Sequence, residues 1–126
     1  MGDITVTIEE CYQLLGGNFA EVMTRLPSVK LVEKFAVKFL GDDSYDTLVR
    51  EMAAGNRQSA FRAAHTLKGV CANMSFTRLF QSASLLTEEL RGDGTAIPDH
   101  ALALLEDVKR DYDLTANTIR SYAAGA

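Results

Sequence analysis

The residues from Ala60 to Met74 carry apolar side chains at the spacing of an α-helix, and this pattern constrains the fold more than any other. The apolar positions recur every three or four residues: Ala60, Ala63, Ala64, Leu67, Val70, Cys71 and Met74. Since a helix advances about 100° per residue, these side chains share one face, centred on Leu67. The pattern predicts a central helix with one face buried.

Helical periods mark the rest of the chain as well, and no segment shows the alternation of a β-strand. Capping residues, glycines and prolines separate predicted helices at about 7–16, 18–26, 28–40, 44–54, 56–74, 76–91 and 98–123. We expect an all-α fold, an up-down antiparallel four-helix bundle with extra short N-terminal helices. The bundle spans about 28–123 with a break at 41–43, the extra helices span about 7–26, and 1–126 form a single domain.

Local signals predict how several helices begin. Thr7 and Glu10 have the form of a capping box, and Asn18 and Ser28 stand where N-caps are needed. The helix that Ser28 starts is apolar over most of its circumference, so we expect it to be largely buried.

Composition excludes several classes of function. A net charge of −4 over 126 residues argues against binding nucleic acid, which requires a basic face. No apolar run approaches the roughly 20 residues of a membrane span, and the N-terminus is too polar for a secretory signal. Cys11 and Cys71 lack metal-site spacing and are interpreted as core residues in a reducing compartment. We therefore expect a cytoplasmic protein that binds no metal.

His65 stands on the opposite side of the central helix from its apolar face. It lies about 160° from Leu67, on the face that contacts water. Gln58, Arg62, Gly69 and Ala72 share that outer face, and Lys68 lies to one side.

This arrangement suits phosphoryl transfer. An imidazole is a good nitrogen nucleophile near neutral pH and can carry a phosphoryl group covalently. Lys68 can offset the phosphoryl charge, and Gly69, without a side chain, leaves room for a second protein to approach. Gly69 could instead end the helix as a C-cap, although the apolar period continues to Met74. A lone surface histidine, which is how we interpret His100, is usually only a solvated residue.

The string Ala64-His65-Thr66-Leu67-Lys68-Gly69 resembles the signature of histidine-containing phosphotransfer (HPt) domains. The similarity extends over most of residues 15–123. Upstream it includes Leu15-Gly16-Gly17-Asn18, Phe35-Ala36-Val37-Lys38-Phe39-Leu40 and the helix and turn from Leu48 to Asn56. Downstream it includes Asn73-Met74, Leu79 and the stretch from Leu86 to Arg91 followed by Gly92-Asp93.

The resemblance implies a phosphorelay intermediate of two-component signalling. His65 would accept a phosphoryl group from the aspartate of a response-regulator receiver domain and pass it to another, with a hybrid sensor kinase as a further partner. The chain shows no phosphate-binding glycine loop, so we expect no ATP-dependent kinase activity and no cofactor of its own. The receiver would supply the magnesium ion. We expect a monomer whose docking surface includes Gln58, Phe61, Arg62, Ala72 and Leu85, although Phe61 could instead belong to the core edge and Leu85 could be an isolated surface residue.

Two positions depart from the family's pattern. Ser75 stands where the family often has glycine, and we expect it to be the N-cap of the following helix. Thr87 stands where the family often has a Gln or Glu that bonds the histidine ring; Glu88 or Gln81 could replace it. These departures leave a second hypothesis open, a module that docks a receiver or kinase without phosphotransfer. A third is a structural bundle cut from a larger kinase, against which the capped Thr7 helix and the alanine-rich end count.

Overall fold

The computed structural model describes residues 6–125 of the protein and shows only helices, turns and loops over that range. The helices are α1 (Ile8–Leu15), α2 (Phe19–Arg25), α3 (Val29–Lys38), the 3-10 turn η1 (Phe39–Gly41), α4 (Ser44–Ala53), α5 (Arg57–Met74), α6 (Thr77–Leu90) and α7 (Asp99–Gly125). The prediction of an all-α fold is confirmed.

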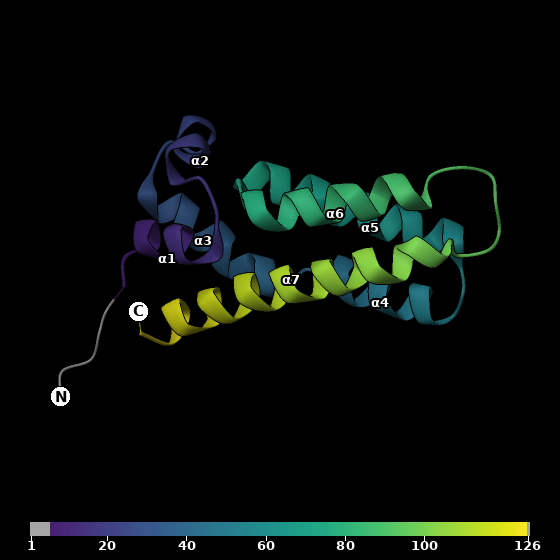
Figure 1. Ribbon diagram of the computed structural model, residues 1–126. Coiled ribbons are helices and arrows are strands. Elements are labelled where there is room, and N and C mark those ends of the chain that lie inside the picture. Colours follow the sequence, from purple (N-terminus) through teal and green to yellow (C-terminus); the bar gives the residue numbers. More distant parts are fainter. Residues whose placement is uncertain (1–5, 126) are drawn as a thin grey trace.

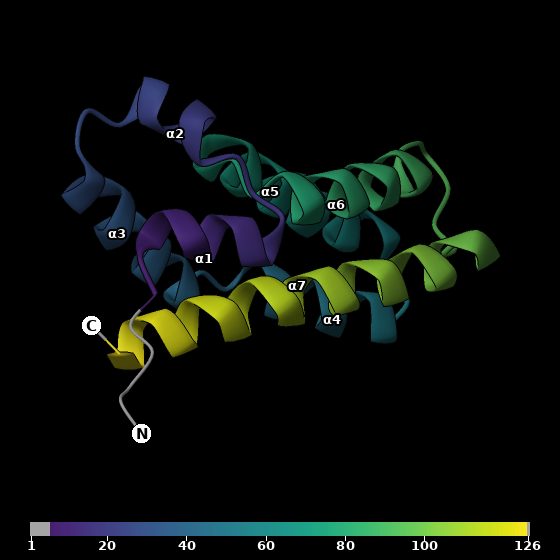
Figure 2. The same cartoon turned by 60° about the vertical axis from the view of Figure 1, so that its left-hand side comes forward.

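The long helices form an up-down antiparallel bundle (Figure 1). α5 packs between α4 and α6, and α7 returns along α6. α3 and η1 extend the layer of α4 along α7, so the predicted break between α3 and α4 is present. α1 and α2 lie at one end of the bundle, where α1 contacts α7 and α2 contacts α3 and α5 (Figure 2). The predicted bundle with short N-terminal helices is therefore the observed one.

Side-chain capping begins the first three helices as the sequence predicts. Thr7 accepts a hydrogen bond from the backbone N–H of Glu10, and the Glu10 carboxylate accepts one from the Thr7 N–H. Asn18 and Ser28 accept bonds from N–H groups three residues on. These caps satisfy backbone donors that have no partner inside the helix.

The prediction that the helix at 28–40 would be largely buried is wrong. Only Val32 and Ala36 of α3 are buried, whereas Val29 and Val37 are 46% and 39% exposed. α3 lies at the end of the bundle, and its exposed residues (29, 30, 34, 37 and 38) share one side of the helix. The apolar residues of a helix show which faces can be buried, but the placement of the neighbouring helices decides which faces are buried.

The core runs the length of the bundle and is rich in aromatic rings where α1 joins it. The Phe76 ring lies 5.5 Å from the Tyr12 ring and 5.1 Å from the Phe39 ring, centre to centre. Cys11 and Cys71 are free and fully buried, as predicted for core residues. Burial raises the pKa of the Cys11 thiol to about 11, which leaves it protonated and unreactive.

A buried carboxylate joins α6 to α7. Asp111 is 2% exposed and accepts hydrogen bonds from Arg78 Nε (2.9 Å) and Arg110 Nε (3.0 Å). Burial alone would raise the pKa of the Asp111 carboxyl, but these bonds outweigh burial and hold the pKa below its usual value. The charged form is therefore the one that the folded protein stabilises.

Candidate functional site

The first residue of α5 anchors the helix that carries His65. The guanidinium of Arg57 donates to the carbonyl oxygens of Leu90 (3.1 Å), Arg91 (2.8 Å) and Ala96 (3.2 Å). The last carbonyls of α6 have no partner within that helix, so Arg57 supplies what the helix lacks. The start of α5 and the end of α6 are thereby held together.

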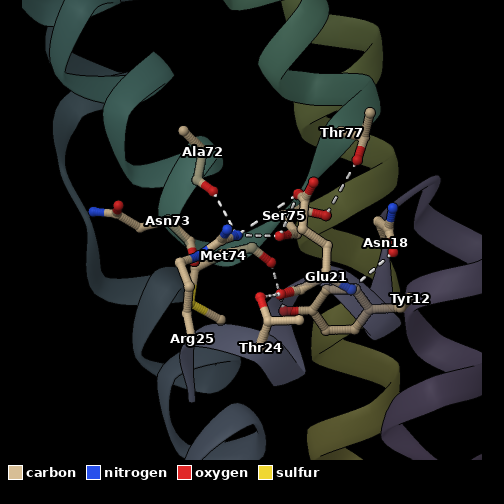
Figure 3. A network of polar contacts seen from close by, with 10 residues as sticks. All are labelled: Tyr12, Asn18, Glu21, Thr24, Arg25, Ala72, Asn73, Met74, Ser75 and Thr77. Atoms are coloured by element: carbon tan, nitrogen blue, oxygen red, sulfur yellow. Dashed lines mark hydrogen bonds and ion pairs between the residues drawn. The ribbon is translucent and has the colours of Figure 1, made fainter.

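The other end of α5 is bound by the N-terminal helices (Figure 3). The Tyr12 hydroxyl donates to the carbonyl of Met74 (2.8 Å). Arg25 of α2 donates to the carbonyls of Ala72 (2.9 Å) and Asn73 (3.2 Å). These three carbonyls belong to the last turn of the helix, where helical donors run out. The Ala72 carbonyl also accepts a bond from the N–H of Ser75 (3.2 Å). We call this region, with Glu21 and Ser75, the polar junction.

Ser75 ends α5 rather than capping α6, so its predicted role as an N-cap is wrong. Its φ of 55° is left-handed, which explains why glycine suits this position. The Ser75 hydroxyl donates to Glu21 (2.7 Å) and accepts a bond from Arg25, so it is already occupied. Phe76 occupies the N-cap position of α6 without a side-chain bond.

His65 lies near the middle of α5, and its side chain is exposed, as the periodicity predicts. α5 continues to Met74, so the alternative that Gly69 ends the helix is wrong. A Cβ atom placed on Gly69 would meet nothing within 4 Å. The helix therefore presents the imidazole beside bare backbone.

The structure places the other predicted site residues around His65 or on the adjacent helix. Gln58, Arg62 and Ala72 of α5 are exposed, and Leu85 of α6 is 59% exposed. Lys68 and Phe61 are half-buried, and the Phe61 ring centre lies 6.0 Å from that of His65. These positions agree with the expected exposure, while the roles of these residues stay predictions.

No hydrogen bond within residues 6–125 orients the imidazole of His65. Thr87, at the position where the family often has a Gln or Glu, is fully buried and donates to the carbonyl of Ala83 (2.7 Å). Of the two suggested replacements, Gln81 is exposed, and Glu88 accepts its bonds from Arg91. The imidazole therefore depends on its rotamer and on a visiting partner for its orientation.

The sequence reasoning missed Arg91 as a neighbour of the site. The guanidinium of Arg91 lies 5.1 Å from the centre of the Phe61 ring. The same ring neighbours the imidazole of His65. Its ion pair with Glu88 has the i, i+3 spacing of helical neighbours, which was a signal available in the sequence.

Several alternatives receive no support from the described residues. Residues 6–125 contain no group of three or more His, Cys, Asp or Glu side chains arranged to hold a metal ion. Within the same range no helix is both long and apolar enough to cross a membrane. His100 is exposed near the start of α7, without a lysine and glycine following it as they follow His65.

Comparison with known families decides the identity of this helical frame. The family model described as "Hpt domain" matches residues 40–114, more than half of the chain and all of α4, α5 and α6. The chain belongs to the Hpt domain family. No curated protein and no solved structure gives a significant match. Membership places this Hpt domain in histidine-phosphotransfer signalling, in which such domains interact with receiver domains and kinases of two-component systems.

The matched range contains His65 and the predicted docking residues, but it excludes α1, α2 and α3. The polar junction therefore joins a family segment to residues outside it. In this Hpt domain, Tyr12 and Arg25 from outside the match bind the end of the helix that carries His65.

Proposed function

We propose that this protein is a phosphorelay intermediate that carries a phosphoryl group on His65 between the aspartates of receiver domains. The observation that carries the proposal is the exposed imidazole in the middle of α5, followed by Lys68 and a Gly69 that faces open space. Among residues 6–125, the side chain of His65 is exposed and open to the approach of a second protein.

The transfer needs only the imidazole from this chain. One ring nitrogen attacks the phosphorus of the aspartyl phosphate, a new N–P bond forms, and the P–O bond breaks with its electron pair leaving on the carboxylate. The other ring nitrogen keeps its proton, so the product is a phosphoimidazolium that returns its phosphoryl group by the same steps in reverse. The receiver supplies the magnesium ion, and this chain supplies no ATP-dependent kinase activity.

Lys68 and Gly69 support that chemistry in different ways. The Lys68 ammonium lies one turn from His65 and offsets phosphoryl charge. Gly69 lets the receiver's backbone and metal site come within reach of the ring, because it adds no side chain beside the imidazole.

The receiver docks on the surface around His65. We assign Gln58, Phe61, Arg62 and Ala72 of α5 and Leu85 of α6 to this surface.

Leu85 is the large exposed apolar side chain on the outer face of α6. Alanine at Leu85 is expected to slow transfer from a cognate receiver without changing the protein's stability. An unchanged rate would remove Leu85 from the interface.

We further propose that the protein acts as a monomer in the cytoplasm, with a hybrid sensor kinase as the source of phosphoryl groups.

The two histidines provide a matched test. The protein is incubated with a receiver domain labelled on its aspartate, and the transferred label is tested for acid lability and stability in base. His65→Gln is expected to accept no label, whereas His100→Gln, which removes the other exposed histidine, accepts as much as the native chain. Label on His65→Gln, or none on the native chain, would refute the proposal.

A second function, docking without transfer, is favoured by one observation. Thr87 is buried and bonded to Ala83, so no long polar side chain from that position orients the ring. In that case a receiver or kinase would bind His65→Ala as tightly as the native chain, and no phosphohistidine would form. Measuring binding and labelling on the same two proteins separates the functions.

A further inference from the structure

An ion pair beside His65 has no part in the transfer chemistry described above. Arg91, which follows the end of α6, donates from Nε to one oxygen of Glu88 (3.1 Å) and from Nη2 to the other (2.7 Å). This is the bidentate geometry in which arginine recognises both carboxylate and phosphate groups. Both side chains are more than half exposed, so the pair contributes little to folding and is easily exchanged.

The Phe61 ring has both the guanidinium of Arg91 and the imidazole of His65 as neighbours. Arg91 lies 5.1 Å from the centre of this ring, and the imidazole lies 6.0 Å from it. Phe61, His65 and Arg91 line one open hollow of about 350 Å³, together with Arg62 and Thr66. A guanidinium that slides over the ring face remains favourably placed for the cation–π interaction throughout.

The backbone of Arg91 is fixed while its side chain is not. Arg57 donates to the carbonyls of Leu90 and Arg91, and its guanidinium packs against Gly94 so closely that a Cβ there would collide with it. The Arg91 side chain itself is about half exposed, so it can rotate away from Glu88.

A phosphoryl group on His65 would compete with Glu88 for this side chain. The carboxylate offers a single negative charge, and a phosphoryl group offers up to two, with three acceptor oxygens. The hydrogen bond from Arg91 lowers the pKa of the Glu88 carboxyl. Electrostatic interactions of this carboxyl with Lys68 and His65 lower its pKa further. Glu88 is thus within electrostatic reach of the reacting ring.

We propose that Glu88 and Arg91 form a phosphate-responsive latch. When His65 is phosphorylated, Arg91 leaves Glu88 and donates to the phosphoryl oxygens across the Phe61 ring; when the phosphoryl group leaves, Glu88 takes Arg91 back. The latch exchanges one ion pair for another and leaves the Glu88 carboxylate in solvent. The latch rests on the proposed function for the phosphorylation of His65. It makes the position of the Arg91 guanidinium depend on whether His65 is phosphorylated.

The test uses the full chain and a donor that needs no receiver. Zwitterionic phosphoramidate transfers its phosphoryl group to imidazole: the N–P bond to ammonia breaks, ammonia leaves, and a bond to one ring nitrogen forms while the other keeps its proton. Every variant also carries His100→Gln, so that only His65 is labelled. ³¹P NMR over a range of pH then measures the proton affinity of the phosphoryl group, which a nearby cation lowers.

The latch predicts a particular pattern among four proteins. Glu88→Gln frees Arg91 and lowers the proton affinity of the phosphoryl group by about threefold, and Arg91→Gln raises it by a similar factor. Because Glu88 competes for Arg91, the effect of Arg91→Gln is larger in the Glu88→Gln background than in the native one. If Arg91 only offset the charge of Glu88 from a distance, Arg91→Gln would change the proton affinity of the phosphoryl group equally in the two backgrounds. An equal change in both backgrounds overturns the latch.

Two further measurements complete the test. Glu89→Gln removes the same charge at the next residue and is expected to change nothing. The ¹H–¹⁵N signal of Arg91 Nε is expected to shift on phosphorylation of the protein that carries His100→Gln alone, and a fixed signal overturns the latch. Labelling by phosphoramidate but not by phosphorylated receivers would refute the relay while the latch is still measured, whereas no label from either donor refutes both.

Discussion

The middle and the end of α5 have opposite designs. At the end, the polar junction satisfies the carbonyls of Ala72, Asn73 and Met74 with donors from α1 and α2. In the middle, His65 is exposed, without a hydrogen bond to its ring among residues 6–125, and Gly69 faces open space. Both stretches belong to the same helix, yet the end is hydrogen-bonded to other helices of the chain, whereas the middle is exposed to a partner protein.

The difference shows how a helix can present a bare nucleophile without losing its position. A reacting group has to be held within a fraction of an ångström of its working geometry. Here the polar junction at the end of α5 and Arg57 at its start hold the backbone, so the residues around His65 are free to serve a partner. The predictions below break or sharpen this comparison, beginning with the largest expected effect.

Gly17→Ala should break the closed region. A Cβ at Gly17 would lie 2.7 Å from the Tyr12 ring and 2.9 Å from the carbonyl oxygen of Ser75, and the latter is backbone. We expect a loss of about 2–3 kcal/mol in the free energy of unfolding, because overpacking forces the junction apart. Urea denaturation measures it. A loss below about 0.5 kcal/mol would show that the junction yields easily.

Asp111→Asn tests whether the α6–α7 contact depends on charge. We expect a loss of about 2 kcal/mol at neutral pH, since Arg78 and Arg110 lose a buried charged acceptor. The folded-state pKa of Asp111 is lowered, so its contribution is complete above the unfolded value of about 3.9 and disappears as the pH falls through the folded-state pKa. The native protein should therefore lose more stability than the variant between about pH 5 and pH 2. Parallel pH profiles would contradict this.

Tyr12→Phe sharpens the comparison by removing a single oxygen from the junction. The Met74 carbonyl loses its 2.8 Å bond inside a buried region, so we expect a loss of about 1 kcal/mol with the packing unchanged. The rate of phosphotransfer to His65 should stay within about twofold of the native rate if the remaining anchors hold α5 in place. A large loss of rate at unchanged affinity for the receiver would show that this one bond positions the nucleophile.

Gly69→Ala should have the smallest effect on stability and the opposite sign. The new methyl group meets nothing within 4 Å, and alanine favours a helix interior over glycine by about 0.5–1 kcal/mol. We expect the protein to become more stable while transfer from a receiver slows by about tenfold or more, because the methyl group stands where the partner approaches. Equal transfer rates would show that the bare backbone is not needed. With Gly17→Ala, this variant makes a matched pair of opposite outcomes.

Much of the fold was predictable because its signals are local. The capping box at Thr7, the caps at Asn18 and Ser28, and the apolar period of α5 each depend on residues within one or two turns. The exposure of His65 follows from the same period. The resemblance, which includes the string from Ala64 to Gly69 and covers most of residues 15–123, agrees with the family match over 40–114.

What failed depended on neighbours that are distant in the sequence. Ser75 was expected to cap α6, but Glu21 and Arg25 occupy its hydroxyl from more than 45 residues away. α3 was expected to be largely buried, but the side of it that carries Val29 and Val37 stays exposed at the end of the bundle.

The sequence by itself determined the helices, the outward direction of His65 and the placing of Lys68 and Gly69 beside it, because a regular helix converts spacing directly into direction. Only the tertiary structure decided which carbonyls at the ends of α5 are bound, which apolar face of α3 stays exposed, and where the guanidinium of Arg91 lies relative to Phe61. Those outcomes depend on contacts between segments that no local period records, since they are fixed when the helices pack together.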